Sequence, residues 1–167
     1  SCDISGEICI KGLNLFKGYL NKPNLTKEKI KKSWFYTGDL GYLDKFNNLF
    51  IIDRIDNMII VGGENIYPSE VENIIPKLKG IYEAVLSSIP HDILGEELVF
   101  IYKLDSNAIE PNVKNWKKVF NQEISSFKIP KKIIDINQLG LNKLPRAHNG
   151  KILRKQIKDI LQNYYSD

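Results

Sequence analysis

The first third of the chain has short apolar stretches between polar, turn-forming residues. Residues 7–11 and 41–43 have the composition of strands, and residues 49–53 continue this pattern after a polar gap. The gap, residues 44–48, is rich in Asp and Asn, which favour tight turns, so it predicts a hairpin. A further turn is predicted at the Lys-Pro-Asn sequence of residues 22–24. We therefore expect this part of the chain to be β-rich.

Beyond Arg54, short apolar runs alternate with apolar residues at helical spacing. This order, with short links between the elements, predicts an α+β fold in which helices pack on a small mixed sheet. The strands are expected at residues 57–61, 84–89, 98–104 and 133–136. The helices are expected on three apolar sets: Val71, Ile74, Ile75 and Leu78; Val113, Trp116, Phe120 and Ile124; and Leu153, Ile157, Ile160, Leu161 and Tyr164.

Local signals predict the limits of the first helix. Ser69 and Glu72 have the spacing of a capping box, so the helix should begin near Ser69. Pro76 should end or kink it, because proline lacks the amide proton that the helix needs. Before the helix, residues 62–65 are predicted to form a loop.

Composition indicates a folded domain with a preference for small anions. The 43% of apolar residues can form a core, and the net charge of +4 is spread along the 167 residues. Such a mild basic excess favours small anionic ligands over a nucleic-acid-binding surface, without excluding either. No apolar run is long enough to span a bilayer and no leader pattern is seen, so we expect a cytoplasmic protein.

Two further features concern the start of the chain and metal binding. The sequence has no initiator Met and enters a strand-like stretch at residues 6–12, so we expect an excised fragment. Cys2 and Cys9 have no metal-binding spacing with His91 or His148, and we expect reduced thiols and no metal site.

Four segments carry the main functional signal. In their order and spacing they resemble the C-terminal signature of the adenylate-forming superfamily, which contains acyl-CoA synthetases, peptide-synthetase adenylation domains and luciferases. The resemblance extends from Gly6 to Arg154. It implies that residues 1–53 are the β-rich end of a large N-terminal domain and residues 54–167 a C-terminal lid domain, with a hinge near residues 53–56. The segments read YTGDL at 36–40, DRIDNMI at 53–59, GGENIYPSEVE at 62–72 and LPRAHNGKILR at 144–154.

Asp39 and Arg54 are candidates for nucleotide binding. Asp39 follows a glycine in a turn, and its two oxygens can accept both hydroxyls of a ribose. The guanidinium of Arg54 suits ribose oxygens or phosphate. The alternatives are a turn aspartate that accepts local amide protons and a surface ion pair of Arg54 with Asp53 or Asp56. The resemblance implies that Asp39 holds the ATP ribose and that Arg54 lies at the nucleotide.

Asp56 and the glycine pair are candidates for the conformational step. The resemblance implies that Asp56 lies at a hinge where a change in backbone torsion swings the C-terminal domain after adenylation. It also implies that Gly62, Gly63 and Glu64 line the channel for the pantetheine thiol. Glycine permits close approach of a ligand to the backbone, but an ordinary turn is the alternative. The sequence contains neither of the two glycine patterns of nucleotide-binding loops, G-x-G-x-x-G and G-x-x-x-x-G-K-[ST].

Lys151 is the strongest catalytic candidate. Its ammonium could contact the acid and the α-phosphate together and stabilise the negative charge that develops between them. The alternative is a solvated surface lysine after the turn that Asn149-Gly150 predicts. The resemblance implies a catalytic lysine directly after this glycine.

A basic segment at residues 127–132 is a candidate for CoA binding. Phe127 could stack on adenine, while Lys128 and Lys131 could neutralise phosphates. An arginine that members of the superfamily often have at the Ile129 position is absent, and Phe127 could instead belong to the core.

These assignments predict an ATP-dependent acyl- or aryl-CoA ligase that uses a carboxylic acid, ATP, Mg²⁺ and CoA, with the Mg²⁺ ligands outside this chain. The alternatives are an adenylation domain that loads a carrier-protein phosphopantetheine, and a non-catalytic anion-binding module. We expect no nucleic-acid partner. Because the phosphate loop and the acid pocket are missing, the chain alone should be inactive, and its acid cannot be identified from the sequence.

Overall fold

The computed structural model describes residues 4–108 and 110–166, so Cys2 lies outside the described residues. The chain divides into two compact units, Ser1–Asp56 and Asn57–Asp167. The boundary falls within a short 3₁₀ turn, η1 (Ile55–Asn57). The assignment of the two parts to a large domain and a lid, with a hinge between them, stays a prediction.

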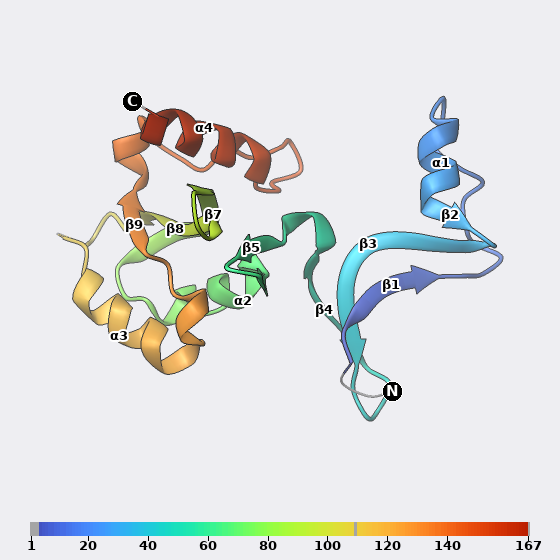
Figure 1. Cartoon of the computed structure of the whole chain (residues 1–167), viewed down its shortest axis with the longest axis horizontal. Coiled ribbons are helices and arrows are strands. Elements are labelled where there is room, and N and C mark those ends of the chain that lie inside the picture. Colours follow the sequence, from blue (N-terminus) through green and yellow to red (C-terminus); the bar gives the residue numbers. More distant parts are fainter. Residues whose placement is uncertain (1–3, 109, 167) are drawn as a thin grey trace. The chain divides into compact units, whose positions relative to one another are not determined.

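The first unit contains one antiparallel sheet (Figure 1). Its longest strand is central and pairs with the other three. The predicted hairpin is confirmed, because the Asp44 carboxylate accepts the amide protons of Phe46 and Asn48 and closes the turn. The strands are β1 (Gly6–Ile10), β2 (Ile30–Lys31), β3 (Trp34–Leu43) and β4 (Leu49–Arg54).

A short helix, α1 (Pro23–Lys29), stands where only a turn was predicted. Proline fits the first position of a helix, since its φ is already helical and no amide proton is needed there. The carbonyl of Lys22 accepts hydrogen bonds from the amide and the hydroxyl of Thr26. No residue of α1 is buried. The helix therefore lacks the apolar stripe by which helices are recognised in a sequence.

The second unit is built on a five-stranded sheet in which one long central strand has neighbours of both directions. It pairs antiparallel with the strand before it over ten positions and parallel with the last strand. This arrangement confirms the expected mixed sheet. The strands are β5 (Ile59–Val61), β6 (Glu64–Ile66), β7 (Ile81–His91), β8 (Gly95–Leu104) and β9 (Lys132–Asp135).

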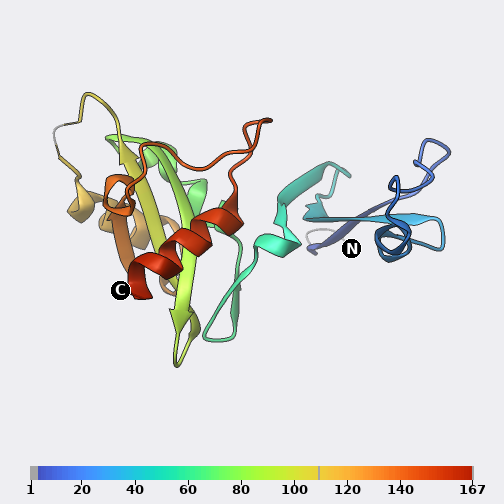
Figure 2. The same ribbon diagram turned by 90° about the horizontal axis from the view of Figure 1, so that it is seen from above.

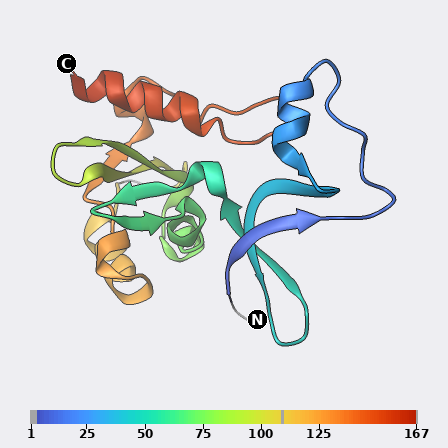
Figure 3. The same cartoon turned by 45° about the vertical axis from the view of Figure 1, so that its right-hand side comes forward.

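Helices cover both faces of this sheet, which confirms the α+β fold. Helices α2 (Pro68–Glu72) and α3 (Val113–Glu123) share one core, and α4 (Arg154–Ser166) covers the other face. Figure 2 shows α4 crossing the long strands, and Figure 3 shows the sheet between α4 and α3. Successive residues of β7 alternate between the cores, since Leu86 packs with α3 and Val85 with α4. The buried helix residues are Pro68 and Val71 on α2, Trp116 and Phe120 on α3, and Ile157 and Leu161 on α4.

The first predicted helix differs in its cap and its end. Glu70, and not Glu72, accepts the amide proton of the N-cap residue Tyr67, so the predicted Ser69-Glu72 capping box is wrong. Pro68 occupies the first helical position, so the helix begins one residue earlier than the predicted start at Ser69. The helix already ends at Glu72, so the prediction that Ile74, Ile75 and Leu78 belong to it is wrong. Pro76 lies in a separate 3₁₀ turn, η2 (Ile75–Lys77).

Two further 3₁₀ turns flank β9, η3 (Ser126–Lys128) and η4 (Ile136–Leu139). Of the helices within residues 4–108 and 110–166, none combines the length and the apolar character needed to cross a membrane.

Candidate functional site

Asp39 and Arg54 lie opposite each other on the neighbouring strands β3 and β4. The Arg54 Nη1 atom donates to Asp39 Oδ1 at 3.0 Å and to the carbonyl of Thr37 at 2.9 Å. Its Nη2 atom contacts Asp56 Oδ2 at 3.4 Å. The structure therefore brings the two predicted nucleotide ligands together and adds the predicted hinge residue to the same cluster.

Thr37, Gly38 and Asp39 lie within β3, at a register shift against β1, so the predicted turn before Asp39 is wrong. Thr37 Oγ1 donates to the carbonyl of Ile8 and accepts the amide proton of Asp39. The amide of Gly38 donates to a carboxylate oxygen of Glu7 at 2.9 Å. Gly38 has a φ of +77°, and a Cβ here would lie 3.0 Å from Arg54 Nη2. The backbone conformation thus favours glycine here, and a Cβ would also crowd the guanidinium that lies beside it.

Arg54 is a permanent cation at an accessible position. Burial alone would lower the pKa of Arg54, but the hydrogen bonds and negative charges of Asp39 and Asp56 outweigh burial and raise that pKa. Both side chains of the Asp39–Arg54 pair remain partly exposed. A polar ligand could therefore reach them, but an exposed ion pair is a sufficient structural explanation, and ATP binding stays a prediction.

Gly62 and Gly63 form the two-residue turn between β5 and β6. Val61 pairs with Glu64 across this turn, so the predicted loop over residues 62–65 is wrong for Glu64 and Asn65, which belong to β6. The φ angles of the two glycines are +59° and +88°, as hairpin turns with the strand twist require. A Cβ at Gly63 would meet nothing within 4 Å, so the turn is open on that side. Glu64 is exposed.

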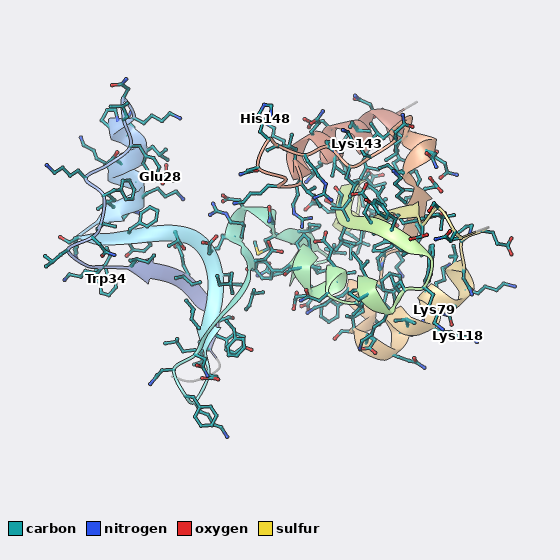
Figure 4. The ribbon with its side chains drawn as sticks, turned by 180° about the vertical axis from the view of Figure 1, so that it is seen from behind. Glu28, Trp34, Lys79, Lys118, Lys143 and His148 are labelled. Carbon is teal, nitrogen blue, oxygen red and sulfur yellow. The ribbon has the colours of Figure 1, made fainter. Side chains whose placement is uncertain are left out.

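Lys151 lies on an exposed hairpin that joins η4 to α4. The amide of Ala147 donates to the carbonyl of Lys151 at 2.8 Å, and the amide of Gly150 donates to the carbonyl of Ala147 at 2.9 Å. Gly150 has a φ of +82°, so the predicted turn is confirmed. In Figure 2 the hairpin projects from the body of this unit, and in Figure 4 His148 points away from its packed core. The Lys151 side chain is exposed.

An ion pair that sequence analysis missed fixes the start of α4. Glu72 on α2 accepts two hydrogen bonds from the Arg154 guanidinium, at 2.9 and 2.7 Å, and one from the amide of Leu86 on β7. Both residues lie within recognised segments, but 82 positions separate them in the chain. No local pattern in the sequence indicates that these two residues pair. The spacing of Ser69 and Glu72 had instead suggested that Glu72 caps a helix.

A second missed ion pair holds the hairpin itself. Arg146 Nη2 donates to Glu83 Oε2 on β7 at 2.8 Å, while Arg146 Nη1 donates to the carbonyl of Gly150 at 2.9 Å. An open groove of about 700 Å³ runs beside this hairpin and includes Gln156 of α4 in its lining.

The candidate CoA segment is only partly available for a ligand. Phe127 has 43% of its surface exposed, so its alternative assignment to the core is wrong. Lys128 Nζ lies 2.6 Å from Glu70 Oε1 and 5.6 Å from the Phe127 ring centroid. Lys131 is exposed. A phosphate would have to compete with Glu70 for Lys128, whereas Lys131 and Phe127 face solvent.

The remaining predictions concern which unit holds each candidate residue and whether a metal ion is bound. Asp39, Arg54 and Asp56 belong to the first unit, while the glycine turn, residues 127–131 and Lys151 belong to the second. Among the described residues, no three His, Cys, Asp or Glu side chains form a group that could hold a metal ion. That the Mg²⁺ ligands lie outside this chain stays a prediction.

Comparison with known proteins gives no matching family model but many related enzymes. The chain is 35% identical over 159 residues to 2-succinylbenzoate–CoA ligase from Geobacillus sp. (strain WCH70), covering 95% of the chain and 31% of that enzyme. It is 32% identical over 155 residues to long-chain-fatty-acid–CoA ligase from Escherichia coli O157:H7, covering 92% of the chain and 26% of the enzyme. The chain thus spans about a third or less of the length of these relatives.

Solved structures of related CoA ligases also match nearly the whole chain. The o-succinylbenzoate CoA synthetase (MenE) from Bacillus subtilis, in complex with the acyl-adenylate intermediate OSB-AMP, superposes with a TM-score of 0.84 at 33% identity over 95% of the chain and 31% of the enzyme. ATP-bound MatB from Rhodopseudomonas palustris has a TM-score of 0.82 at 31% identity over 100% of the chain and 31% of that protein. The chain therefore belongs to the adenylate-forming superfamily of acyl-CoA ligases and corresponds to a C-terminal portion of its members.

Proposed function

We propose that this chain is the C-terminal part of an ATP-dependent acyl- or aryl-CoA ligase. Such an enzyme activates a carboxylic acid as an acyl-adenylate and transfers the acyl group to the thiol of CoA. The observation that carries the proposal is the exposed hairpin that presents Lys151 directly after Gly150, in a chain whose relatives are named as CoA ligases over 92–95% of its length.

The surface of the first unit supports the view that it completes a larger domain. Among residues 4–56, only Gly38 and Gly41 are buried, so no apolar side chain there lies in a core. A sheet that leaves its apolar side chains in water needs further protein against it. We expect the chain alone to activate no acid, since the remainder of the pocket would have to come from that further protein. The exposed apolar side chains include Leu13, Leu20, Phe46 and Ile51.

In the proposed first half-reaction, a carboxylate oxygen attacks the α-phosphorus of ATP and pyrophosphate leaves. Negative charge increases at the bridging oxygens, and the Lys151 ammonium is mobile enough to approach and stabilise it. The Asp39–Arg54 pair would hold the ribose, because Asp39 offers acceptors for its hydroxyls while Arg54 offers donors. Mg²⁺, when bound by groups elsewhere, would neutralise the phosphates.

In the proposed second half-reaction, the CoA sulfur attacks the acyl carbonyl carbon and AMP leaves. The lid domain would first rotate about Asp56, so that Lys151 withdraws and the Gly62-Gly63 turn, with Glu64, lines the thiol channel. Asp56 makes the longest of the three polar contacts of the Arg54 guanidinium, at 3.4 Å, which suits a contact that must change.

CoA is the proposed acceptor. The relatives reported above are named as CoA ligases, and no observation favours a carrier protein or a non-catalytic anion-binding role. Phe127 and Lys131 are exposed and would contact the CoA adenine and phosphates. A cytoplasmic location is also proposed, because the enzyme would draw on cytoplasmic ATP and CoA.

The test uses the full-length protein that contains this chain. In Lys151→Ala, we expect ATP–pyrophosphate exchange with the cognate acid to fall at least about 100-fold, a loss typical of removing one transition-state charge partner. Transfer of the acyl group from supplied acyl-adenylate to CoA should stay within about twofold of wild type. The cognate acid is identified beforehand by an exchange screen against a panel of acids.

Lys143→Ala is the matched control, because Lys143 is another exposed lysine of the same connecting segment (Figure 4). It should leave both half-reactions unchanged. Equal loss of both half-reactions in Lys151→Ala, with an unchanged melting temperature, would refute the proposed role of Lys151.

A further inference from the structure

Among residues 4–108 and 110–166, the side chain of Arg146 provides the polar link between the Lys151 hairpin and the sheet, while Ile152 at the base of the hairpin packs against the core beneath α4. Arg146 donates from Nη2 to Glu83 and from Nη1 to the carbonyl of Gly150, the peptide group that directly precedes Lys151. The other hydrogen bonds of the hairpin, such as Lys151 to the Asn149 side chain, are local and set only its internal shape. Arg146 is therefore the side chain whose hydrogen bonds connect the turn before Lys151 to the sheet.

The position of Glu83, the partner of Arg146, is fixed by the sheet. It lies on β7, which pairs with β8 along most of its length, and only 14% of its side chain is exposed. While its Oε2 atom accepts from Arg146, its Oε1 atom accepts the amide proton of Leu144 at 3.3 Å. Leu144 is itself buried in the core beneath α4. One carboxylate thus holds the connecting segment at two points, Leu144 just before the hairpin and Arg146 at its base.

The chemistry of the link requires arginine. A guanidinium has donors in a fixed planar fork, so it can bind a carboxylate and a carbonyl at the same time, whereas an ammonium is a single point of charge. Arg146 is 43% exposed, and ion pairs at such positions add little to stability because water screens them. Its contribution to folding should therefore be small compared with its effect on the position of the hairpin.

We propose that Arg146, held by Glu83, is a positioning residue that orients Lys151 for adenylate formation. This inference rests on the proposed function of Lys151. A charged group stabilises a transition state well only if it is already oriented, and a displacement of about 1 Å can cost about 100-fold in rate. A hairpin joined to the sheet only at its two ends would lack that orientation. The link acts in adenylation alone, because Lys151 is withdrawn during thiol transfer.

The experiment compares Arg146→Lys and Glu83→Gln in the full-length protein. Both changes conserve size, Arg146→Lys keeps the positive charge, and Glu83→Gln keeps an acceptor for Leu144. We expect kcat for ATP–pyrophosphate exchange to fall about 10- to 100-fold in Arg146→Lys and less in Glu83→Gln. KM for the acid and transfer from supplied acyl-adenylate to CoA should change less than about threefold. The melting temperature should shift by no more than a few degrees.

Hydrogen exchange on the 167-residue chain provides a readout that does not depend on activity. In Arg146→Lys, the amide protons of Ala147 and Gly150 should exchange faster, while amides of β7 and β8 keep their wild-type rates. The matched control is Lys77→Gln, which removes another ion pair of the same unit, Lys77–Glu123 at 2.6 Å. This control should leave adenylation, thiol transfer and hairpin exchange unchanged.

The outcomes separate this inference from the proposed function. If Lys151→Ala abolishes adenylation while Arg146→Lys retains it, the positioning role is refuted and the proposed function stands. If Arg146→Lys impairs both half-reactions equally, its role is structural and the inference is also wrong. If Lys151→Ala leaves adenylation intact, both proposals fall.

Discussion

Single residues here are chosen for backbone conformation as much as for side-chain chemistry. Gly63 has a φ of +88° but no neighbour that a Cβ would strike, so only its torsion requires glycine. Gly38 differs, because in addition to its φ of +77° a Cβ would crowd the nearby Arg54 guanidinium. The sequence predicted a turn at both positions, but only Gly63 lies in a turn, whereas Gly38 lies within β3.

Gly63→Ala tests the conformational reason alone. We expect it to lower the free energy of unfolding of the second unit by about 1–2 kcal/mol, because an alanine pays this penalty in the left-handed region. Gly63→Asn should lose clearly less, since asparagine tolerates positive φ. Urea unfolding followed by circular dichroism measures both. Equal stability of the alanine variant and wild type would contradict the assigned turn conformation.

Elements of the second unit are joined by charged pairs that sequence reasoning could not find. Apolar periodicity predicted the helices α3 and α4 and the four strands β5, β7, β8 and β9, because burial imposes a regular pattern on each of them. It missed α1, which buries nothing, the short strands β2 and β6, and residues 34–40 of β3. It also misassigned Glu72. Ion pairs follow from the folded topology, since their partners lie far apart in the chain and any charged residue is compatible with an exposed helix position.

The same limit applies to the candidate site. Motif order predicted where Asp39, Arg54 and Lys151 stand in the chain, and the register of β3 and β4 then brings Asp39 and Arg54 together. The role of Arg146 could not be predicted, because it depends on Glu83, which is 63 positions away.

The ion pair between Glu96 of β8 and Lys158 of α4 should be sensitive to acid. Burial raises the pKa of Glu96, but its hydrogen bonds with Lys158, Ser88 and the amide of Ile60 outweigh burial, and the net pKa is lowered. A carboxylate with a lowered folded-state pKa stabilises the fold above its unfolded-state pKa and loses this contribution as pH falls. The contribution should therefore be complete near neutral pH and decline below about pH 4.3, the ordinary glutamate value.

Glu96→Gln tests this contact. It should lower the free energy of unfolding at pH 7 by roughly 1 kcal/mol, as expected for a hydrogen bond to a partly exposed charged group. The difference from wild type should shrink steadily between about pH 4.3 and pH 3. Thermal melts at a series of pH values measure it, with Lys158→Met expected to show the same trend. A difference that stays constant down to pH 3 would contradict the proposed ionic contact.

At the scale of the whole molecule, the two units differ in their capacity to fold alone. The second unit buries large apolar side chains on both faces of its sheet, including Trp116, Phe100 and Leu161. The first unit buries only glycines among residues 4–56. Ordering a residue costs about 1–2 kcal/mol of conformational entropy, and apolar burial is the main term that offsets it.

We therefore expect residues 57–167, expressed without the first unit, to unfold in one cooperative transition, while residues 1–56 show none. Phe120→Ala in the shorter chain should lower the free energy of unfolding by about 3–5 kcal/mol, since it removes a fully buried ring that packs edge-to-face on Phe100. Denaturant unfolding followed by circular dichroism and tryptophan fluorescence measures both effects. Cooperative unfolding of residues 1–56 would contradict the view that the first unit is part of a larger domain. The same transition midpoint in residues 57–167 and in the intact chain would locate the stability of this molecule in its second unit.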